Sequence, residues 1–358
     1  MTGSQLLYIL IFAGVLLCTG ISAQDAGPKS HEDSLTIVFY NVENLFDSYD
    51  DTLKRDEEFL PGGIRNWHTG RFYAKIGNIA KTLIAVGGWE APAIIGLCEI
   101  ENRYVLEKLI YSSPLQSFDY RIIHQESPDA RGIDVALLYR DDCFGPEKTI
   151  FRQPVFDHDT SKRSRDILYI KGSIRSGQRL HLFVNHWPSK YGGLLETVPA
   201  REAAALTLKE MVDSIYGSET DPRILIMGDF NDEPNSHSVS EALGAGLHFP
   251  DCPCEKGLYN LMHPYSEVAD LGTNKYQGEW SVIDQFICSS ALLCSDSSMV
   301  IAGGRAHIFC PGFLLEKDER YLGKKPFRTF YGPRYLGGFS DHLPIYVKLA
   351  VPAANRNE

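Results

Sequence analysis

Several short polar motifs in this 358-residue chain stand next to strongly apolar runs and carry side chains that could do chemistry. They contribute Asn41, Glu99, His186, Asp229, Asn231, Asp341 and His342. Carboxylate oxygens are hard ligands suited to Mg²⁺, Mn²⁺ or Ca²⁺, and histidine gains or loses a proton near neutral pH. A metal ion beside proton-handling groups is well suited to phosphoester hydrolysis, so the residue types indicate that chemistry.

Such residues need a scaffold that brings the ends of strands together. Nine runs rich in Ile, Val, Leu and Tyr predict strands, at 35–42, 93–100, 120–124, 134–140, 167–174, 180–187, 223–227, 282–288 and 343–349. Apolar residues at helical spacing predict helices over 72–86 and 201–215. This mixture predicts an α/β fold, in which polar side chains at strand ends can meet in one crevice.

Composition is that of a folded globular protein, with 44% hydrophobic and 23% charged residues. The net charge of −11 argues against a protein that wraps long nucleic acids by bulk charge, although a local basic patch stays open. No linker or charge block divides the chain. We therefore expect one domain over 33–351, a flexible segment 24–32, a flexible tail 352–358, and a monomer.

The N-terminal region predicts export. Residues 6–17 are apolar but too short to span a bilayer comfortably, and small residues lead up to Gln24. We expect residues 1–23 to be a cleaved signal peptide and the mature protein to be secreted or periplasmic, with no integral membrane segment. A lipoprotein anchor through Cys18 is the alternative, but Leu17 is bulkier than that cleavage usually tolerates.

The cysteines do not predict a disulfide framework. Seven remain after residue 23, and an odd number cannot all pair. Cys252 and Cys254 are too close for a conventional disulfide bond and lack the second pair that a zinc site would need. We expect most cysteines to be buried small hydrophobic residues. One disulfide stays open, with no pairing assigned.

Seven sequence blocks in a fixed order resemble the endonuclease/exonuclease/phosphatase superfamily. They are YNVENLFD (40–47), LCEIEN (97–102), RGIDVALLYR (131–140), NHWPSK (185–190), GDFND (228–232), VIDQF (282–286) and SDHLP (340–344). This superfamily includes pancreatic-type deoxyribonucleases, exonuclease III-like repair nucleases, neutral sphingomyelinases and inositol polyphosphate 5-phosphatases. The resemblance implies a four-layer α/β/β/α sandwich of two mixed β-sheets packed face to face and flanked by helices.

The resemblance also implies a metal site. Glu99 would be the principal ligand, helped by Asn41 and Asp341. The expected ion is Mg²⁺ or Mn²⁺, with Ca²⁺ as a further alternative. Whether one or two ions act stays open.

Five residues would then carry the catalytic chemistry. Asp229 would orient or deprotonate the attacking water, and Asn231 would hold a phosphate oxygen. His342 would stabilise developing charge on the scissile phosphate, with Asp284 holding its ring. His186 would be the general acid for the leaving oxygen or a phosphate ligand.

Four further residues are candidates for the substrate side of the site. Asp134 is expected to orient His186, or else to be a strand-start acid that faces solvent, and Arg131 could reach a phosphate. Lys190 belongs to the NHWPSK block. Arg328 lies in the basic and aromatic segment 324–331, a mixture that would suit base stacking and phosphate pairing or else a solvated loop.

Three functions follow, in order of preference. The first is a secreted, divalent-metal-dependent phosphodiesterase that acts on nucleic acid as a DNA or RNA endonuclease. The second is a phosphatase or phospholipase C-type hydrolase of the same fold, acting on a phospholipid headgroup or a phosphorylated small molecule. The third is a binding protein on a disabled scaffold. It would lack one of the main catalytic residues, and the sequence retains all of them.

Overall fold

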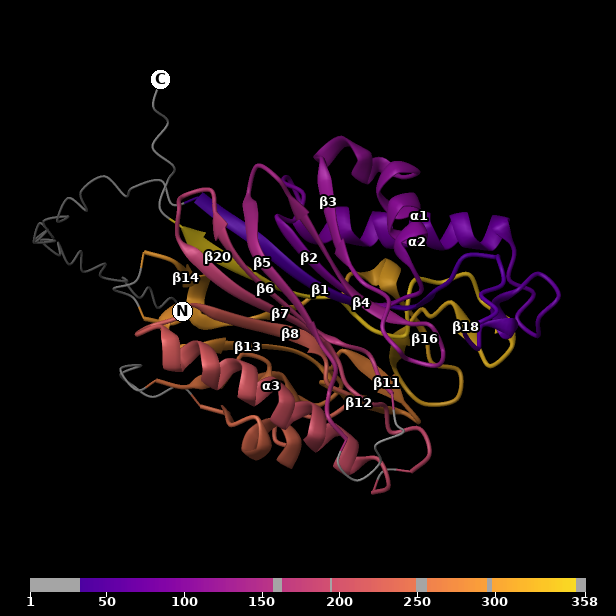
Figure 1. Ribbon diagram of the computed structural model, residues 1–358. Helices are drawn as coiled ribbons and strands as arrows, with labels where there is room; N and C mark the ends of the chain where they lie inside the picture. Colours follow the sequence, from indigo (N-terminus) through magenta and orange to yellow (C-terminus); the bar gives the residue numbers. More distant parts are fainter. Residues whose placement is uncertain (1–32, 157–162, 194, 249–255, 295–297, 352–358) are drawn as a thin grey trace, which may run out of the picture.

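The computed structural model describes residues 33–156, 163–193, 195–248, 256–294 and 298–351. Two seven-stranded mixed sheets pack face to face, and helices cover their outer faces (Figure 1). The predicted four-layer α/β/β/α sandwich is confirmed. The expectations for residues 1–23, 24–32 and 352–358 lie outside the described residues.

The first sheet has its longest strand at its centre. Its order is β14 (Val300–Ile301), β20 (Ile345–Val351), β1 (Asp33–Leu45), β2 (Ile94–Ile100), β4 (Asp134–Arg140) and β3 (Tyr120–His124), with β15 (His307–Ile308) also paired to β20. Among the described strands of this sheet, β1 and β2 form the only parallel pair. The carboxyl ends of β1 and β2 therefore lie at the same edge.

The second sheet also has a parallel pair of strands in its interior. Its order is β5 (Phe144–Arg152), β6 (Ile167–Ile174), β7 (Arg179–His186), β8 (Ile224–Asp229), β13 (Asp284–Ser289), β10 (Leu258–Asn260) and β9 (Ala245–Gly246). The parallel pair β7–β8 places His186 opposite Asp229 at its carboxyl end. Asp284, at the start of antiparallel β13, also lies opposite Asp229.

Helices α1 (Thr69–Gly87) and α2 (Arg103–Tyr111) cover the first sheet, and α3 (Val198–Ser218) covers the second (Figure 1). The helices predicted at 72–86 and 201–215 are confirmed and extend further at both ends. The remaining helical segments are α4 (His263–Ser266), a π turn at Ser238–Ala242, and 3₁₀ turns at Glu57–Phe59, Pro114–Phe118, Ser290–Leu292, Ala302–Gly304 and Gly312–Leu314.

Three hairpins complete the fold near the C-terminal part of the described chain. They are β11–β12 (Asn274–Tyr276, Glu279–Ser281), β16–β17 (Leu315–Lys317, Lys324–Pro326) and β18–β19 (Phe330–Tyr331, Arg334–Tyr335). The sequence did not predict these short strands.

Alternation along β1 shows how one strand serves two hydrophobic layers. Ile37 and Phe39 belong to the core between the sheets, whereas Val38 and Tyr40 pack in the layer that contains α1 and α2. The sheets approach closely at Gly96, where a Cβ atom would lie 2.8 Å from the sulfur of Met227. The strand periodicity therefore fixes which side chains can reach the ends of the sheets.

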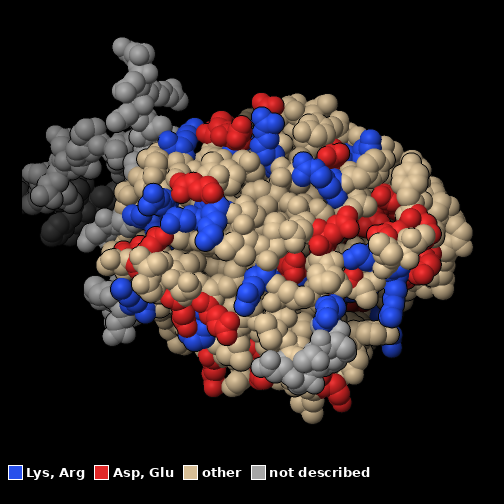
Figure 2. All heavy atoms as spheres, in the orientation of Figure 1, with Lys and Arg blue, Asp and Glu red and all other residues tan. Residues whose placement is uncertain are grey.

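Acidic and basic side chains are interspersed over the face seen in Figure 2, with no long stripe of Lys and Arg among the residues described there. Among the described residues, none of the helices combines the length and apolar character needed to cross a bilayer. The cysteines in the described ranges, Cys98, Cys143, Cys288, Cys294 and Cys310, are all free, and Cys252 and Cys254 lie outside those ranges.

Candidate active site

The ends of β1, β2 and β8 have an unusual backbone. Glu43 (φ 52°), Asn44 (φ 56°), Glu99 (φ 61°) and Asn231 (φ 51°) all adopt the left-handed region, which is unfavourable for residues other than glycine. The β1–β2 register also shifts beyond Asn41. Strained backbone of this kind clusters at functional sites, where the surrounding structure maintains it.

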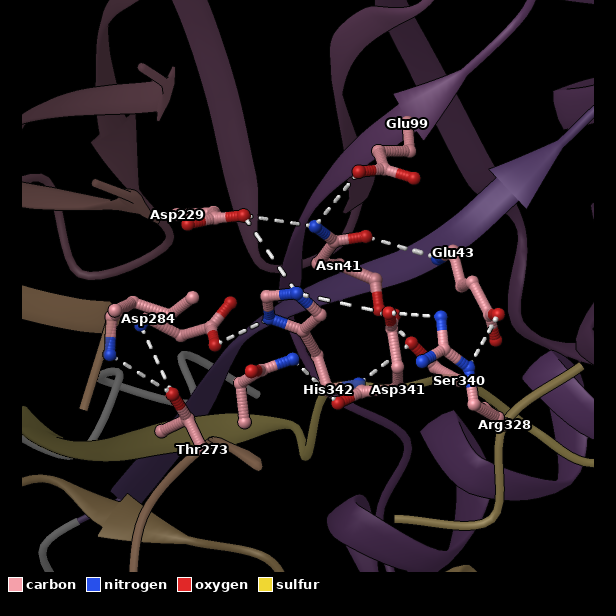
Figure 3. A network of polar contacts seen from close by, with 12 residues as sticks. Asn41, Glu43, Glu99, Asp229, Thr273, Asp284, Arg328, Ser340, Asp341 and His342 are labelled. Atoms are coloured by element: carbon pink, nitrogen blue, oxygen red, sulfur yellow. Dashed lines mark hydrogen bonds and ion pairs between the residues drawn. The ribbon is translucent and has the colours of Figure 1, made fainter. Parts of the chain in front are cut away.

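Asn41 links the two sheets. Its amide nitrogen donates to Glu99 Oε1 at 3.3 Å and to Asp229 Oδ2 at 3.0 Å, while its oxygen accepts from the Glu43 backbone at 2.9 Å (Figure 3). The backbone N–H of Asn44 donates to Glu99 Oε2 at 2.9 Å. The strained turn after β1 thus holds the Glu99 carboxylate. The amide nitrogen of Asn41, which is a hydrogen-bond donor and cannot bind a cation, faces the carboxylates. The role of Asn41 as a metal ligand therefore stays a prediction.

His342 lies between acidic side chains. Its Nδ1 is 2.7 Å from Asp284 Oδ2, and its Nε2 is 3.9 Å from Asp229 Oδ2 and 4.0 Å from Asp341 Oδ1 (Figure 3). Burial lowers the pKa of His342, but Asp284, Asp229 and Asp341 together raise it well above its ordinary value. The raised pKa favours the protonated form of His342, and the contact with Asp284 fixes the orientation of its ring.

Asp229 is enclosed at the end of β8. Burial and the nearby Asp284 raise the pKa of Asp229 to about 7, although His342 and the Asn231 backbone N–H oppose the shift. A carboxylate with this pKa can accept a proton near neutral pH. The preceding Gly228 is required because a Cβ atom there would lie 2.6 Å from the Cβ and carbonyl oxygen of Asn185.

His186 is also enclosed, at the end of β7. Its Nε2 lies 3.7 Å from Asp229 Oδ2 and 3.9 Å from Glu99 Oε1, and its Nδ1 is buried without a hydrogen-bond partner. Burial, and then the positive charges of Arg165 and Arg131, lower the pKa of His186 well below its ordinary value. His186 is therefore a neutral imidazole.

Arg165 shapes this part of the site through the backbone. It donates to the carbonyl oxygens of His186 and Trp187 and forms an ion pair with Asp129 at 3.2 Å. Trp187 itself is buried and packs edge-on against Phe230. The structural role of Arg165 depends on contacts between distant segments, which the sequence does not reveal.

The expectation that Asp134 orients His186 is wrong. Asp134 instead lies 3.2 Å from Nε2 of His124 and accepts a hydrogen bond from the Ser127 backbone at 2.8 Å. The reason is local: both carboxylate oxygens of Asp134 are used in the β3–β4 connection, and Nδ1 of His186 has no hydrogen-bond partner. Asp134 is buried and holds the β3–β4 connection, so it is not available to the substrate.

A second ionic network lies beside the His342 turn. Arg328 contacts Asp341 Oδ2 at 2.8 Å and Glu43 Oε1 at 3.4 Å. Burial raises the pKa of Asp341, but Arg328, His342 and Lys75 outweigh it and hold that pKa below its ordinary value. Asp341 therefore stays a carboxylate.

Lys75 is a site residue that sequence reasoning missed. It is buried on α1, donates to the Thr329 hydroxyl and the Phe339 carbonyl, and has a pKa lowered by burial to about 8. The sequence feature that could have revealed it is a lysine on the apolar face of the helix, beside Phe72 and Ile76. A lysine at such a position is expected to have a buried polar partner. Here its partners, Thr329 and Phe339, belong to the segment that leads to Ser340.

Ser340 joins the beginning and end of the described fold. Its hydroxyl donates to the Asn41 carbonyl at 2.7 Å and accepts from the His342 backbone at 3.1 Å. Thr273 braces the other side, because its hydroxyl accepts from the Asp284 backbone and its carbonyl from the Leu343 backbone. These contacts fix the spacing between Asp284 and His342.

Three candidates for substrate contact lie at the margin of the site. Arg131 is half-exposed and 3.6 Å from Asp129, and Lys190 is 3.4 Å from Asp232. Asn231 donates one amide hydrogen to the Trp187 carbonyl at 3.0 Å. Phosphate contacts by these residues and by Arg328 stay predictions.

The donor set fits a divalent cation. Five carboxylates (Glu43, Glu99, Asp229, Asp284 and Asp341) surround three cationic side chains (Lys75, Arg328 and His342), and one Asp284 oxygen has no hydrogen-bond partner. The ligand atoms of Asp229, Asp284 and His342 lie within 4.8 Å of one another, but the Nδ1 of His342 is already hydrogen-bonded to Asp284. Glu99 and Asp341 have the more accessible carboxylates and remain the ligand candidates.

Solved structures share this fold. An endonuclease/exonuclease/phosphatase family protein from Bacteroides thetaiotaomicron is 16% identical, with a TM-score of 0.55 over 92% of this chain and 99% of that one. A mannosyl-6-phosphatase from the same species is 18% identical, with a TM-score of 0.54 over 88% and 99%. D. rerio TDP2, complexed with a single strand DNA product, is 15% identical, with a TM-score of 0.52 over 88% and 98%. At these identities the likeness shows the fold alone.

Sequence comparison shows to which family the chain belongs. A curated relative, chorionic somatomammotropin hormone 2 from Bos taurus, is 27% identical over 139 residues, which is 32% of this chain. The chain spans 58% of that relative's length, and the match carries no argument about the site. The model of the endonuclease/exonuclease/phosphatase family, in contrast, matches residues 36–351 and so includes every residue of the site. The chain belongs to the endonuclease/exonuclease/phosphatase family of phosphoester-hydrolysing enzymes.

Proposed function

We propose that this enzyme is a divalent-metal-dependent phosphodiesterase that cleaves nucleic acid, with Mg²⁺ or Mn²⁺ as its ion. The observation that carries the proposal is the Asp284–His342 pair beside Asp229, which supplies a charged donor and a proton acceptor around one point. Phosphodiester hydrolysis needs both, since water must lose a proton and the leaving alkoxide must gain one.

The mechanism assigns a separate task to each group. Glu99 and Asp341 would hold the ion, which when bound neutralises phosphate charge and makes water more acidic. Asp229 accepts the proton of the attacking water, because its pKa is about 7. The His342 imidazolium donates a hydrogen bond through Nε2 to the phosphate and a proton to the leaving oxygen, while Asp284 keeps its ring in place.

This assignment revises the expectation for His186. A general acid must carry a proton to give, and the lowered pKa of His186 leaves it neutral near pH 7. A neutral imidazole can still donate one N–H to a phosphate oxygen. We therefore retain the phosphate-ligand role for His186 and give the general-acid role to His342.

The groups that transfer protons suit a diester substrate. A diester has a single negative charge, and the pair of a proton acceptor (Asp229) and a charged donor (His342) supplies both proton transfers that its hydrolysis requires. The interspersed surface charges favour a single strand over a long duplex, which is held by many phosphate contacts (Figure 2).

The test is hydrolysis by purified protein with Mg²⁺, with Mn²⁺ or with EDTA. Its substrates are a single-stranded oligonucleotide, plasmid DNA, bis(para-nitrophenyl) phosphate, para-nitrophenyl phosphate and sphingomyelin. We expect metal-dependent cleavage of the oligonucleotide and the diester, falling about 1,000-fold in His342→Ala. His237→Ala, at an exposed histidine, is the matched control.

Each other outcome has a definite meaning. Turnover of only the monoester or only sphingomyelin would replace the nuclease proposal with the phosphatase or phospholipase alternative. Full activity in His342→Ala would overturn the assigned mechanism.

We further propose that residues 1–23 are removed during export, leaving Gln24 as the first residue. Mass spectrometry of the mature protein tests this cleavage. A chain that still carries residues 1–23, or one that begins with a lipid-modified Cys18, would overturn it.

A further inference from the structure

A groove of about 570 Å³ opens beside the active site, between the hairpins β11–β12, β16–β17 and β18–β19. Arg328 belongs to both places, because it lines this groove and also forms the ion pairs with Asp341 and Glu43. Arg328 therefore connects the catalytic centre with the groove.

The β11 wall of the groove is attached directly to the catalytic turn. The Asn274 amide donates to the Asp341 carbonyl at 2.9 Å, and Asn274 forms a β-bridge with His342. Two residues further along the same strand is Tyr276, which lines the groove. Since a strand rises about 3.4 Å per residue, Tyr276 lies about 7 Å along β11 from Asn274, the residue that is bridged to His342.

The groove is also built in advance. Lys275 is buried, donates to the carbonyls of Leu322 at 2.9 Å and Lys324 at 3.2 Å, and lies 3.4 Å from Asp318. These contacts fasten β11 to the β16–β17 hairpin. The walls are therefore held in position before any ligand arrives, which lowers the entropic cost of binding.

The lining is positively charged although the protein is acidic. It contains six Lys and Arg residues and three Asp and Glu residues, in a chain whose net charge is −11. The three lysines pair with the three lining acids, and Arg328 pairs with Asp341 and Glu43, so two arginines remain in excess. Arg320 and Arg334 are exposed and have no carboxylate partner among the described residues. Such a lining attracts an anion, and two unpaired guanidinium groups suit phosphate.

Exposed aromatic rings accompany these charges. Tyr276 is 70% exposed and Tyr331 is 56% exposed, far more than the enclosed tyrosines of the core. Lys325 Nζ lies 5.7 Å from the Tyr331 ring centroid, and the Arg320 guanidinium lies 5.4 Å from that of Tyr321. Exposed rings next to cations form the combination that stacks nucleobases and pairs with their phosphates.

We propose that this tyrosine groove (Tyr276, Tyr321, Tyr331, Arg320 and Arg334) binds the nucleotide next to the scissile phosphodiester of a single-stranded nucleic acid. The base stacks on Tyr276 or Tyr331, and Arg320 and Arg334 hold the adjoining phosphate. The strand must be single because bases within a duplex are already stacked and cannot lie on a tyrosine. The inference rests on the proposed nuclease function and specifies its substrate.

The experiment compares two substrates in the metal-loaded full chain. The variant is Tyr276→Ala with Tyr331→Ala, and the control is Tyr111→Ala, an exposed tyrosine on α2. We expect the ratio of KM for a single-stranded oligonucleotide to KM for bis(para-nitrophenyl) phosphate to rise about tenfold or more in the variant only. Wild-type protein given an abasic oligonucleotide should show the same rise, with no further increase in the variant.

A salt titration tests the arginines. Arg334→Gln should reduce the slope of log KM for the oligonucleotide against log salt by about 0.7, the value for one phosphate contact on a single strand. Arg121→Gln, an exposed arginine on β3, should leave the slope unchanged.

The outcomes separate this inference from the function on which it rests. An unchanged substrate ratio in the double tyrosine variant, with active cleavage of the oligonucleotide, would overturn the groove assignment alone. Failure of wild-type protein to cleave any nucleic acid, with the chromogenic diester hydrolysed, would overturn the nuclease function and the inference together. Thermal unfolding at the wild-type temperature would show that the variant is folded, as expected for exposed side chains.

Discussion

The two sheets each bring the carboxyl ends of a parallel strand pair to the site, but they deliver side chains of different accessibility. On the side of the first sheet, the side chains of Glu99 and Asp341 are 15% and 26% exposed. On the side of the second sheet, His186 and Asp229 are each 2% exposed and Asp284 is 1% exposed. We call these the accessible side and the enclosed side.

The difference separates two chemical requirements. An ion that exchanges with solvent needs carboxylates that stay charged and can be reached. Proton transfer near neutral pH needs shifted pKa values, and burial among charges produces them. The raised pKa values of Asp229 and His342 and the lowered pKa of His186 all belong to groups in or against the enclosed side.

The largest expected effects test this division directly. Glu99→Gln on the accessible side and Asp229→Asn on the enclosed side should each lower kcat/KM about 1,000-fold, the first by weakening the ion site and the second by removing the proton acceptor. Raising Mg²⁺ should restore part of the activity of Glu99→Gln and none of that of Asp229→Asn. The measurement is kcat/KM across an Mg²⁺ titration.

Glu107→Gln and Asp213→Asn, two exposed acids on helices, are the matched controls. Rescue of Asp229→Asn by Mg²⁺, with none for Glu99→Gln, would reverse the division between the two sides.

A pH profile of Asp284→Asn should show a smaller effect, about 100-fold near neutral pH. In the wild type, activity should rise with pH through about 7, as Asp229 loses its proton, and persist into the alkaline range, since Asp284 keeps His342 protonated. Asp284 raises both pKa values, so its removal should move both limbs of the profile to lower pH.

The measurement is kcat/KM from pH 5 to 10 in both proteins. An alkaline limb at the same pH in Asp284→Asn would show that Asp284 does not control the protonation of His342.

Asn41 spans the two sides, and Asn41→Ala should lower kcat/KM about tenfold. It removes the amide that holds Glu99 and Asp229 in register without removing either carboxylate. Because both groups become misplaced, Mg²⁺ should restore only part of the loss. Asn235→Ala, at an exposed asparagine, provides the comparison in the same kinetic assay.

Glu101→Gln should have the smallest effect on activity. Glu101 follows Glu99 by two residues and is buried, and burial raises its pKa from 4.5 to about 8. The folded protein keeps this proton between about pH 4.5 and 8 while the unfolded chain releases it. The wild type should therefore lose on the order of 4 kcal/mol of unfolding free energy across that range, at about 1.4 kcal/mol for each pH unit.

Glu101→Gln should not show this loss, because it does not titrate. Urea unfolding at pH 5 and pH 8 measures it, alongside kcat/KM. A large fall in kcat/KM would mean that the site extends beyond the two sides described.

Much of the fold could be predicted from the sequence because its strands are buried and apolar. The runs at 120–124, 134–140 and 167–174 coincide with β3, β4 and β6. Strand β5, in contrast, is an edge strand in which most residues are exposed and Glu147, Lys148 and Thr149 interrupt the apolar residues, so it has no apolar run to reveal it. Helix α2 was missed although Asn102 caps it and Val105, Leu106 and Leu109 have helical spacing.

Part of the site could likewise be predicted from the sequence and part could not. Its main acids and histidines stand at strand ends that local sequence marks, and the structure brings Glu99, His186, Asp229 and His342 together with Asn41. The partners of these residues could not be predicted, because Lys75, Arg165 and Asp134 acquire their roles from pairings between distant segments. The mistaken link between Asp134 and His186 arose because the sequence does not show that His124 and Ser127 occupy both oxygens of the Asp134 carboxylate.

One hydroxyl has a consequence for how the enzyme is made. Ser340 bonds to Asn41 across 299 residues of chain, and β20 inserts between β14 and β1 in the first sheet. A growing polypeptide on the ribosome therefore has no assembled active centre until synthesis has passed Val351, because Asp341, His342 and the strand that supports them emerge so late. The nascent chain is consequently without phosphoester-hydrolysing activity, which begins only with completed folding.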